Sequence, residues 1–314
     1  MSVYPLLEHH AARWYNSVFQ HREAEALRRA LVIVNPIAGR GAGERSVPEV
    51  ERGLRDCGVA TDVALTRSAG DARAAAAQAA GHDLVVVVGG DGTLNEVVNG
   101  LEADLPLALW PLGTGNVLAK ELRLPRRLSR FCEMVARGRE RALDVPSADG
   151  RQFVSMAGAG FDAEVASVLA SGRRGAIHIT RYLGPLLSVL ARYRFPSLQV
   201  CVDGGEPTPS AGLAIVSNVR AYGGPLVVTP DADPSDGSLD VCVFRQGTRL
   251  GYVRALLGFF LGSQRLLGGA RYFRGREVRL TSEERVPYQV DGDPAGFLPA
   301  TIRLLDRRVR FIVP

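Results

Sequence analysis

Residues 84–99 read Leu84-Val85-Val86-Val87-Val88-Gly89-Gly90-Asp91-Gly92-Thr93-Leu94-Asn95-Glu96-Val97-Val98-Asn99. The opening run of valines is typical of a strand that is buried on both faces of a parallel sheet. After the glycine turn, apolar residues recur at helical spacing, which predicts a helix that begins at Thr93. A strand, a glycine turn and a helix in succession direct free backbone N–H groups at an anion, and glycines let a phosphate approach the backbone.

The carboxylate of Asp91 stands in this turn, where it can face a metal ion or a substrate hydroxyl. A plain turn with a solvated aspartate is the alternative interpretation, because glycine turns are common. The string differs from the dinucleotide-binding fingerprint, since the last glycine of G-x-G-x-x-G would fall on Asn95. Glycines, an aspartate and a threonine directly after a valine run favour a functional turn.

The chain has 314 residues, which is enough for two domains with proper cores. A net charge of +5 and a pI near 9.3 favour anionic partners, such as nucleotide phosphates or an acidic membrane surface. We expect no nucleic-acid partner, because the sequence has no basic block and no zinc-finger spacing. Lys120 is the only lysine, so any phosphate clamp must use backbone N–H groups or arginine.

The cysteines are scattered, with no C-x-x-C pair, at Cys57, Cys132, Cys201 and Cys242. This spacing argues against a zinc site or a disulfide framework and fits a reducing cytoplasm. The first residues lack a secretory apolar core, and no apolar run reaches the ~20 residues that span a bilayer. We therefore expect a cytoplasmic protein that is soluble or lies on a membrane surface.

In the first half, apolar strands alternate with helical segments. The predicted strands are 30–36, 60–66, 84–88 and 107–111, and the predicted helices include 47–57 and 71–80. This alternation predicts an α/β domain with a doubly wound parallel sheet, whose ligands bind beyond the carboxyl ends of the strands. The segments that fall at those ends are Asn35, the 39–43 glycine loop, Thr66, the 89–93 turn, and Thr114 with Asn116. Because all of these segments fall at the carboxyl ends of the strands, they predict a nucleotide site.

From about residue 143 the pattern changes to short period-two strands separated by turns. They are expected at 153–157, 198–202, 212–217, 238–244, 277–281, 288–290 and 301–305. This pattern predicts an antiparallel sandwich or barrel, interrupted by apolar helical segments at 180–193 and 251–267. The second of these segments carries Arg254 and Arg265, so it is either a core-packing helix or a surface that meets lipid.

We divide the chain into a first domain of residues 1–142 and a second of residues 143–314. Residues 1–28 are expected to form a helix docked on the first domain, with a membrane-leaning helix or a homodimer contact as the alternative. Two acidic turns, 229–240 and 290–294, lie in the second domain. Such Asp-Gly turns usually form hairpins, but clustered aspartates also suit a hard cation.

Three strings of the first half, VIVNPIAGRG (32–41), VVGGDGTLNEVVNGL (87–101) and PLGTGN (111–116), resemble the catalytic domain of diacylglycerol and sphingosine kinases. Three strings of the second half, at 153–165, 229–240 and 289–293, resemble the second domain of that family. The bacterial soluble lipid kinases of the group are the most similar in length and layout. The GGDGT string alone is shared with NAD kinases and resembles phosphofructokinases, whereas the full set is far more specific.

The resemblance implies ATP-dependent phosphorylation of a lipid hydroxyl in a cleft between the domains, with Mg²⁺ and with peripheral contact to a membrane surface. It implies nucleotide contacts at Asn35, Pro36, Ile37, Ala38, Gly39, Thr66, Gly89, Gly90, Asp91, Gly92, Thr93, Leu94, Asn95 and Thr114. It implies Asp236 as a magnesium ligand, flanked by the carbonyls of Asp233 and Ser238. The general base falls on Asp293, with Asp91 orienting metal or water or sharing that role.

Two features depart from the family pattern. The base position usually holds glutamate, and Asp293 is one methylene shorter. The family also commonly has a tail that returns to the first domain, whereas this sequence stops at Pro314, so we expect residues 1–28 to cover that surface.

Two other functions compete with the lipid kinase. One is a kinase of a soluble nucleotide such as NAD, and the other is a non-catalytic lipid-binding protein that keeps the fold. The apolar 251–267 segment favours lipid over NAD, and the carboxylates of Asp91, Asp236 and Asp293 argue for catalysis.

Overall fold

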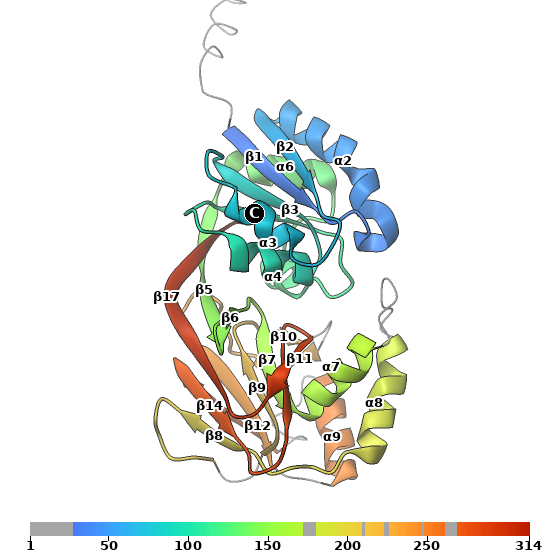
Figure 1. Ribbon diagram of the computed structural model, residues 1–314, viewed down its shortest axis with the longest axis vertical. Coiled ribbons are helices and arrows are strands. Elements are labelled where there is room, and N and C mark those ends of the chain that lie inside the picture. Colours follow the sequence, from blue (N-terminus) through green and yellow to red (C-terminus); the bar gives the residue numbers. More distant parts are fainter. Residues whose placement is uncertain (1–27, 172–179, 209–210, 223–225, 246–247, 261–268) are drawn as a thin grey trace, which may run out of the picture.

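A computed structural model describes the chain except for residues 1–27, 172–179, 209–210, 223–225, 246–247 and 261–268. The expectations for residues 1–28 therefore fall almost entirely outside the described residues. Figure 1 shows two stacked parts that are joined by two long strands, with the C-terminus in the upper part.

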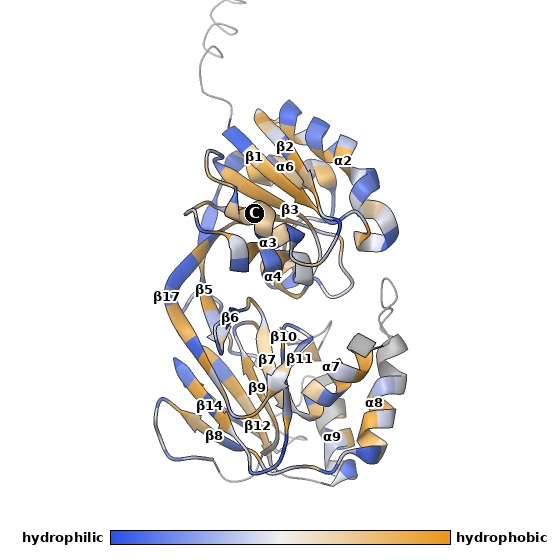
Figure 2. Cartoon of the chain, viewed as in Figure 1, coloured by the Kyte–Doolittle hydropathy of each residue, from blue (hydrophilic) through white to orange (hydrophobic). Residues whose placement is uncertain are grey.

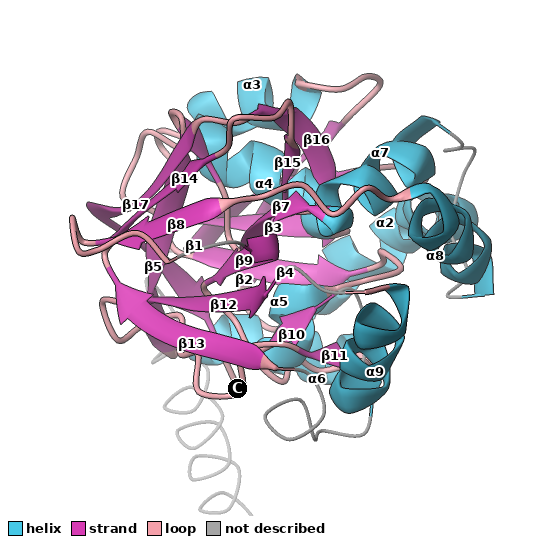
Figure 3. Ribbon diagram, turned by 90° about the horizontal axis from the view of Figure 1, so that it is seen from below, coloured by secondary structure: helices cyan, strands magenta, loops and turns pink. Residues whose placement is uncertain are grey.

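The upper part is the expected doubly wound domain. Its parallel strands lie in the order β2 (Val59–Leu65), β1 (Arg28–Val34), β3 (Leu84–Gly89) and β4 (Leu107–Pro111). All six residues of β3 are buried, as the valine run predicts. Helices α3 (Asp71–Ala77) and α4 (Asp91–Gly100) pack together over one face, and α2 (Ala38–Asp56) and α6 (Leu128–Arg137) pack together over the other (Figure 3). The short helix α5 (Val117–Glu121) follows β4.

The lower part contains an antiparallel sheet. Its strand order is β13 (Ala270–Gly275), β12 (Leu239–Arg245), β9 (Ala211–Ser217), β7 (Met156–Gly160), β15 (Pro287–Val290) and β16 (Asp293–Phe297). Against it lie the lower strands of the large sheet, β8 (Gln199–Val202), β14 (Glu277–Thr281), β17 (Ala300–Ile312) and β5 (Glu140–Ala148). The buried side chains of Val278, Ile302, Val216, Val241 and Val290 form the core between the two layers, as expected for a sandwich.

The remaining elements flank this sandwich. They are β6 (Arg151–Gln152), β10 (Ala221–Tyr222), β11 (Leu226–Val227), α7 (Phe161–Ser171), α8 (Thr180–Arg192) and α9 (Arg249–Phe260). Figure 2 shows apolar strands at the centre of both parts and mixed hydropathy on the helices α7, α8 and α9.

The last strand differs from the expectation. A strand limited to residues 301–305 is wrong, because β17 continues to Ile312 and pairs with β5 over both parts, with an irregularity between Leu304 and Arg308. Its end, Phe311, pairs with Leu107 of β4, so the C-terminal segment itself returns to the first domain. The expected boundary between residues 142 and 143 falls inside β5, which also runs along both parts.

Candidate active site

The glycine turns of the first domain meet at the carboxyl edge of the parallel strands. The side-chain amide of Asn35 donates a hydrogen bond to the Thr93 hydroxyl (3.1 Å), which joins the loop after β1 to the turn after β3. The backbone N–H of Leu112 donates to the Gly89 carbonyl (2.8 Å), which adds the loop after β4. Segments that lie far apart in the sequence therefore form one surface, as predicted from their places at the carboxyl ends of parallel strands.

At two positions glycine is required because backbone atoms of another segment lie where a Cβ would be. A Cβ on Gly90 would lie 2.9 Å from the Cα of Gly113, so these two loops pack backbone against backbone. A Cβ on Gly43 would overlap the Asn35 carbonyl oxygen. By contrast, a Cβ on Gly92 would meet nothing within 4 Å, and no side chain caps the N-terminus of α4. Free N–H groups that face open space at a helix N-terminus fit a phosphate.

The other residues predicted to contact nucleotide fall into two groups. Ile37, Gly39, Thr66 and Thr114 lie at this same edge, and Ile37 is 79% exposed. The side chain of Leu94 is instead fully buried in the core, so only its backbone can face a ligand. Nucleotide binding by the whole set stays a prediction.

Asp91 is the half-buried first residue of α4. One carboxylate oxygen accepts a hydrogen bond from the backbone N–H of Val117 at the start of α5 (2.8 Å). Burial, together with the negative charge of Asp291, raises the pKa of Asp91 to about 6, although N–H groups of α5 oppose this shift. The turn aspartate therefore lies close enough to a carboxylate of the other domain for its charge to act on the pKa of Asp91.

Asp291 is a residue of this junction that the sequence argument did not single out. Its carboxylate accepts hydrogen bonds from the backbone N–H groups of Val154, Ser155 and Met156 and from the Asn95 side chain, at 2.9–3.0 Å. Burial nevertheless raises its pKa. The sequence signal for Asp291 was its place as the first aspartate of the 289–293 string, whose last aspartate, Asp293, was predicted as the base.

The contact between Asn95 and Asp291 also joins the two domains. Asn95 lies on α4, and Asp291 lies in the turn between β15 and β16. Predicted as a nucleotide contact, Asn95 has its side chain directed at the second domain, where it also donates to the Gln152 carbonyl (3.2 Å). Of the two acidic turns of the second half, the 290–294 turn thus reaches α4 of the first domain at Asp291.

Asp293, the predicted base, lies two residues further along at the start of β16. Its carboxylate forms an ion pair with the Arg151 guanidinium at 3.3 Å, and its side chain is 33% exposed. The structure therefore places Asp293 on the same hairpin as Asp291, with an arginine beside it.

The predicted magnesium ligands lie in the turn before β12. The Asp233 carboxylate bonds to the Arg141 guanidinium (2.5 Å) and to Ser235, and the Asp236 carboxylate bonds to Arg274. The N–H of Ser238 donates to the other oxygen of Asp236 (3.0 Å). Across the described part of the chain, no group of three or more His, Cys, Asp or Glu side chains could hold a metal ion, and a magnesium site at Asp236 stays a prediction.

A basic cavity of about 550 Å³ adjoins the glycine turns. Trp110, Leu112 and Leu124 give it apolar walls, and the exposed side chains of Lys120 and Arg123 contribute positive charge. The lone lysine of the chain thus lies beside the loop that carries Thr114.

Comparison with known proteins supplies the family. Residues 29–148 match the model of the diacylglycerol kinase catalytic domain, and residues 155–313 match the model of the YegS C-terminal NAD kinase beta sandwich-like domain. A diacylglycerol kinase of Mycobacterium tuberculosis is 31% identical over 296 residues, which cover 91% of this chain and 95% of that protein. This chain belongs to the diacylglycerol kinase family.

Further relatives agree with this assignment. A diacylglycerol kinase of Bacillus subtilis is 28% identical over 298 residues, covering 92% of this chain and 97% of that protein. A crystal structure of a diacylglycerol kinase from Bacillus anthracis superposes with a TM-score of 0.70 at 20% identity, covering 93% of this chain and 98% of that chain. The superposition supports the fold alone.

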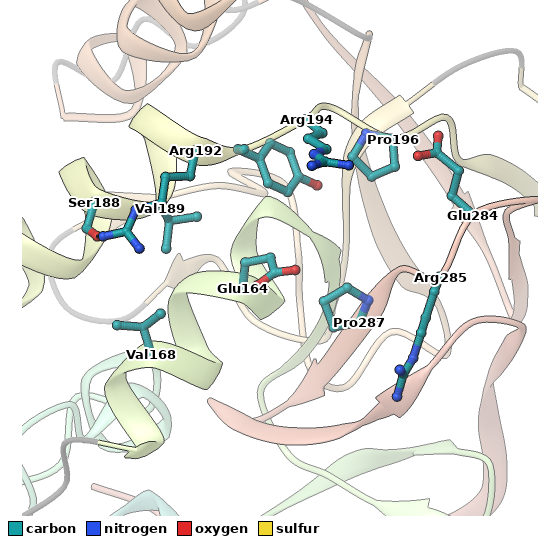
Figure 4. A pocket seen from close by; sticks show the side chains of 11 residues that line it. Glu164, Val168, Ser188, Val189, Arg192, Arg194, Pro196, Glu284, Arg285 and Pro287 are labelled. Carbon is teal, nitrogen blue, oxygen red and sulfur yellow. The ribbon is translucent and has the colours of Figure 1, made fainter.

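A second cavity of this diacylglycerol kinase family member lies apart from the glycine turns. It has a volume of about 470 Å³ and opens between α7, α8 and the segment that leads into β15, and its charged lining residues are Glu164, Glu284, Arg192, Arg194 and Arg285 (Figure 4). None of the predicted site residues lines this cavity.

Within the described residues, no helix combines the length and the hydropathy of a membrane span.

Proposed function

We propose that this protein is an ATP-dependent lipid kinase that transfers the γ-phosphoryl group to a lipid hydroxyl. The observation that carries the proposal is the hydrogen bond from Asn95 of α4 to Asp291, which brings an acidic turn of the second domain to the helix that begins with Asp91 at an uncapped N-terminus. Phosphoryl transfer requires mainly positioning and charge neutralisation, and this junction offers both anion-binding N–H groups and cation-binding carboxylates.

The nucleotide phosphates would be held by backbone N–H groups of the 89–93 turn and the 113–116 loop, since glycines there leave the backbone open. ATP supplies the phosphoryl group that is transferred. Asp91 and Asp291 would hold Mg²⁺, because a cation would relieve the raised pKa values of these two carboxylates, and the ion would supply charge neutralisation for the phosphates. Lys120 and Arg123 add positive charge beside the same loop.

Asp293 is proposed to accept the proton of the lipid hydroxyl. Its carboxylate is partly exposed on the hairpin that Asp291 anchors, and Arg151 orients it. A carboxylate within reach of the hydroxyl is the usual general base for such a transfer. Asp91 is the alternative base, and variants of the two residues distinguish them: Asp293→Asn should abolish transfer to lipid if Asp293 is the base, and leave it largely intact if Asp91 is.

A membrane surface is proposed as the partner that delivers the substrate. Helices α8 and α9 expose Leu187, Leu250, Val253 and Leu257, whose side chains are 38–66% exposed. Their sequences contain arginines and no acidic residue. The guanidinium of Arg249 donates to carbonyls at the end of α8, so the start of α9 contacts the end of α8. Apolar side chains with flanking arginines fit an anionic bilayer surface.

The test uses purified protein, γ-labelled ATP and Mg²⁺ with vesicles that contain a panel of lipids with free hydroxyls, and mass spectrometry of the products. We expect a phosphorylated lipid from the wild type, loss of product in Asp91→Asn, and full activity in the exposed control Asp306→Asn. Phosphorylation of soluble NAD in place of any lipid would favour the competing nucleotide kinase. Lipid binding without ATP turnover would favour the non-catalytic protein.

A further inference from the structure

A chain of three hydrogen bonds connects helix α7 to the turn that carries Asp291 and Asp293. The Tyr222 hydroxyl donates to one carboxylate oxygen of Asp162, the second residue of α7. The side-chain amide of Gln289 donates to the other oxygen (2.7 Å). The backbone N–H of Gly292 donates to the amide oxygen of Gln289 (2.6 Å), which completes the chain.

The central members of this chain are deeply buried. Asp162 is 5% exposed and Gln289 is 1% exposed, although both side chains are polar. A Cβ on Gly158 would overlap the Asp162 carboxylate, so the strand β7 has a glycine where the carboxylate needs room. Burial raises the pKa of Asp162 to about 6. A buried carboxylate is costly, and neither nucleotide binding nor proton transfer at Asp293 uses this one.

The carboxylate fixes the orientation of the Gln289 amide. Because Asp162 accepts, the NH₂ group of Gln289 must face it, and the amide oxygen must then face Gly292. That oxygen holds a turn in which two consecutive residues, Asp291 (φ 49°) and Gly292 (φ 84°), are left-handed. A non-glycine residue in this conformation is unfavourable unless its surroundings hold it there.

We propose that Asp162 is a positioning residue for the reaction, which acts through Gln289 to set the conformation of the turn that presents Asp291 and Asp293. Figure 3 shows α7 beside the hairpin of β15 and β16, where this connection runs. The catalytic consequence rests on the proposed kinase function. The hydrogen-bond chain itself can be tested without it.

The test exchanges the polarity of one bond. In Asp162→Asn, the amide oxygen can still accept from Gln289 when the new NH₂ group faces the Tyr222 hydroxyl, which can rotate to accept, so this variant keeps the connection to the turn. In Gln289→Glu, two carboxylates face each other. In the double variant D162N/Q289E, the new amide at position 162 donates to the new carboxylate at position 289, whose other oxygen still accepts from Gly292. Gln289→Glu is therefore the mismatched variant, and the double variant restores the donors and acceptors between the helix and the turn.

Two readouts are measured on the full-length protein. The first is kcat for lipid phosphorylation together with KM for ATP. We expect kcat to fall about tenfold or more in Gln289→Glu, the effect of one misplaced hydrogen bond, with KM for ATP within about twofold of wild type and a smaller change of kcat in Asp162→Asn. The second is hydrogen exchange of a peptide that spans residues 286–297, in which the turn should exchange faster in Gln289→Glu. Both readouts should return toward wild type in D162N/Q289E.

Several outcomes would overturn the proposal. A double variant as impaired as Gln289→Glu, or a Gln289→Glu variant with unchanged kcat and unchanged exchange, would show that the bond does not set the turn. If Gln289→Glu fails to fold, the double variant still decides, because only restored pairing predicts that it folds and exchanges like wild type. If the wild type phosphorylates no lipid, the proposed function fails, whereas the exchange result still judges the connection from Asp162 to Gly292.

Discussion

The two acidic regions of this protein differ in what faces their carboxylates. At the domain junction, the charge of Asp291 acts on Asp91, and the pKa of each is raised, chiefly by burial. In the turn before β12, arginines face both Asp233 and Asp236. Although burial raises the pKa of Asp233, hydrogen bonds from Ser235 and Arg141 lower it below its ordinary value overall.

This difference separates two uses of the same side chain. In the turn before β12, arginines already neutralise the carboxylates of Asp233 and Asp236, so these side chains serve mainly to hold the turn in place. Two partly buried carboxylates that repel each other store unfavourable electrostatic energy that a bound cation or a proton can relieve. The junction is therefore the region where we expect the fold to give up stability for ligand binding, as functional sites often do.

The largest effect is expected from Asp91→Asn. Loss of its charge should lower kcat by about 10³-fold, as for other groups that stabilise a transition state electrostatically. The asparagine oxygen can still accept from the Val117 N–H, so the protein should remain folded. Steady-state kinetics with lipid vesicles measure this change, and Asp306→Asn is the exposed control. Undiminished turnover would remove Asp91 from the mechanism.

Asp291→Ala should have the next largest effect, on stability. It leaves three backbone N–H groups and the Asn95 amide without their acceptor, which should lower the free energy of unfolding by about 3 kcal/mol. Denaturant unfolding measures this loss. Asp233→Ala is the matched control, because it removes a carboxylate from a partly exposed ion pair and should cost under about 1 kcal/mol. Equal losses in the two variants would contradict the comparison.

A smaller effect concerns pH. Because the pKa of Asp91 is about 6 in the folded state and 3.8 ordinarily, the folded state binds the proton more tightly between these values. The contribution of Asp91 to stability is therefore full below about pH 4 and is lost as the pH rises through about 6.

Between pH 5 and 7.5, the free energy of unfolding of wild type should fall by about 1 kcal/mol more than that of Asp91→Asn. Denaturant unfolding at a series of pH values measures both curves. Activity should change in the opposite direction, rising as Asp91 loses its proton. Parallel stability curves for the two proteins would show that Asp91 is not protonated in this range.

The smallest effect is expected from Asp236→Asn. The Asp236 side chain is 29% exposed and the Arg274 side chain is 50% exposed, so loss of the ion pair should cost about 0.5 kcal/mol. Activity and its dependence on Mg²⁺ concentration should stay within about twofold of wild type, since Arg274 already neutralises the carboxylate. A marked rise in the Mg²⁺ requirement would instead support Asp236 as a magnesium ligand and would narrow the contrast between the two regions.

Much of this arrangement could be predicted from local patterns. The valine run predicted a fully buried strand, and the glycine strings predicted turns that meet at one edge, because carboxyl ends of parallel strands share that edge. The 277–281 strand matches β14, which is Glu277–Thr281. The end of the chain could not be predicted in this way, because the alternation in β17 is broken between Leu304 and Arg308, where the strand passes from one domain to the other.

By itself, the sequence determined the two domains of the fold and the glycine turns, because strand and helix periodicity and glycine conformations are local properties. The helix after the 89–93 turn begins at Asp91, two residues before the predicted Thr93. Only the tertiary structure decided which distant carboxylate lies near Asp91. Asp291 reaches that position through β15, three backbone N–H groups and Asn95, and these contacts join residues 135–196 positions apart. Burial and the charge of a distant neighbour set a carboxylate's pKa, and no local pattern encodes either of them.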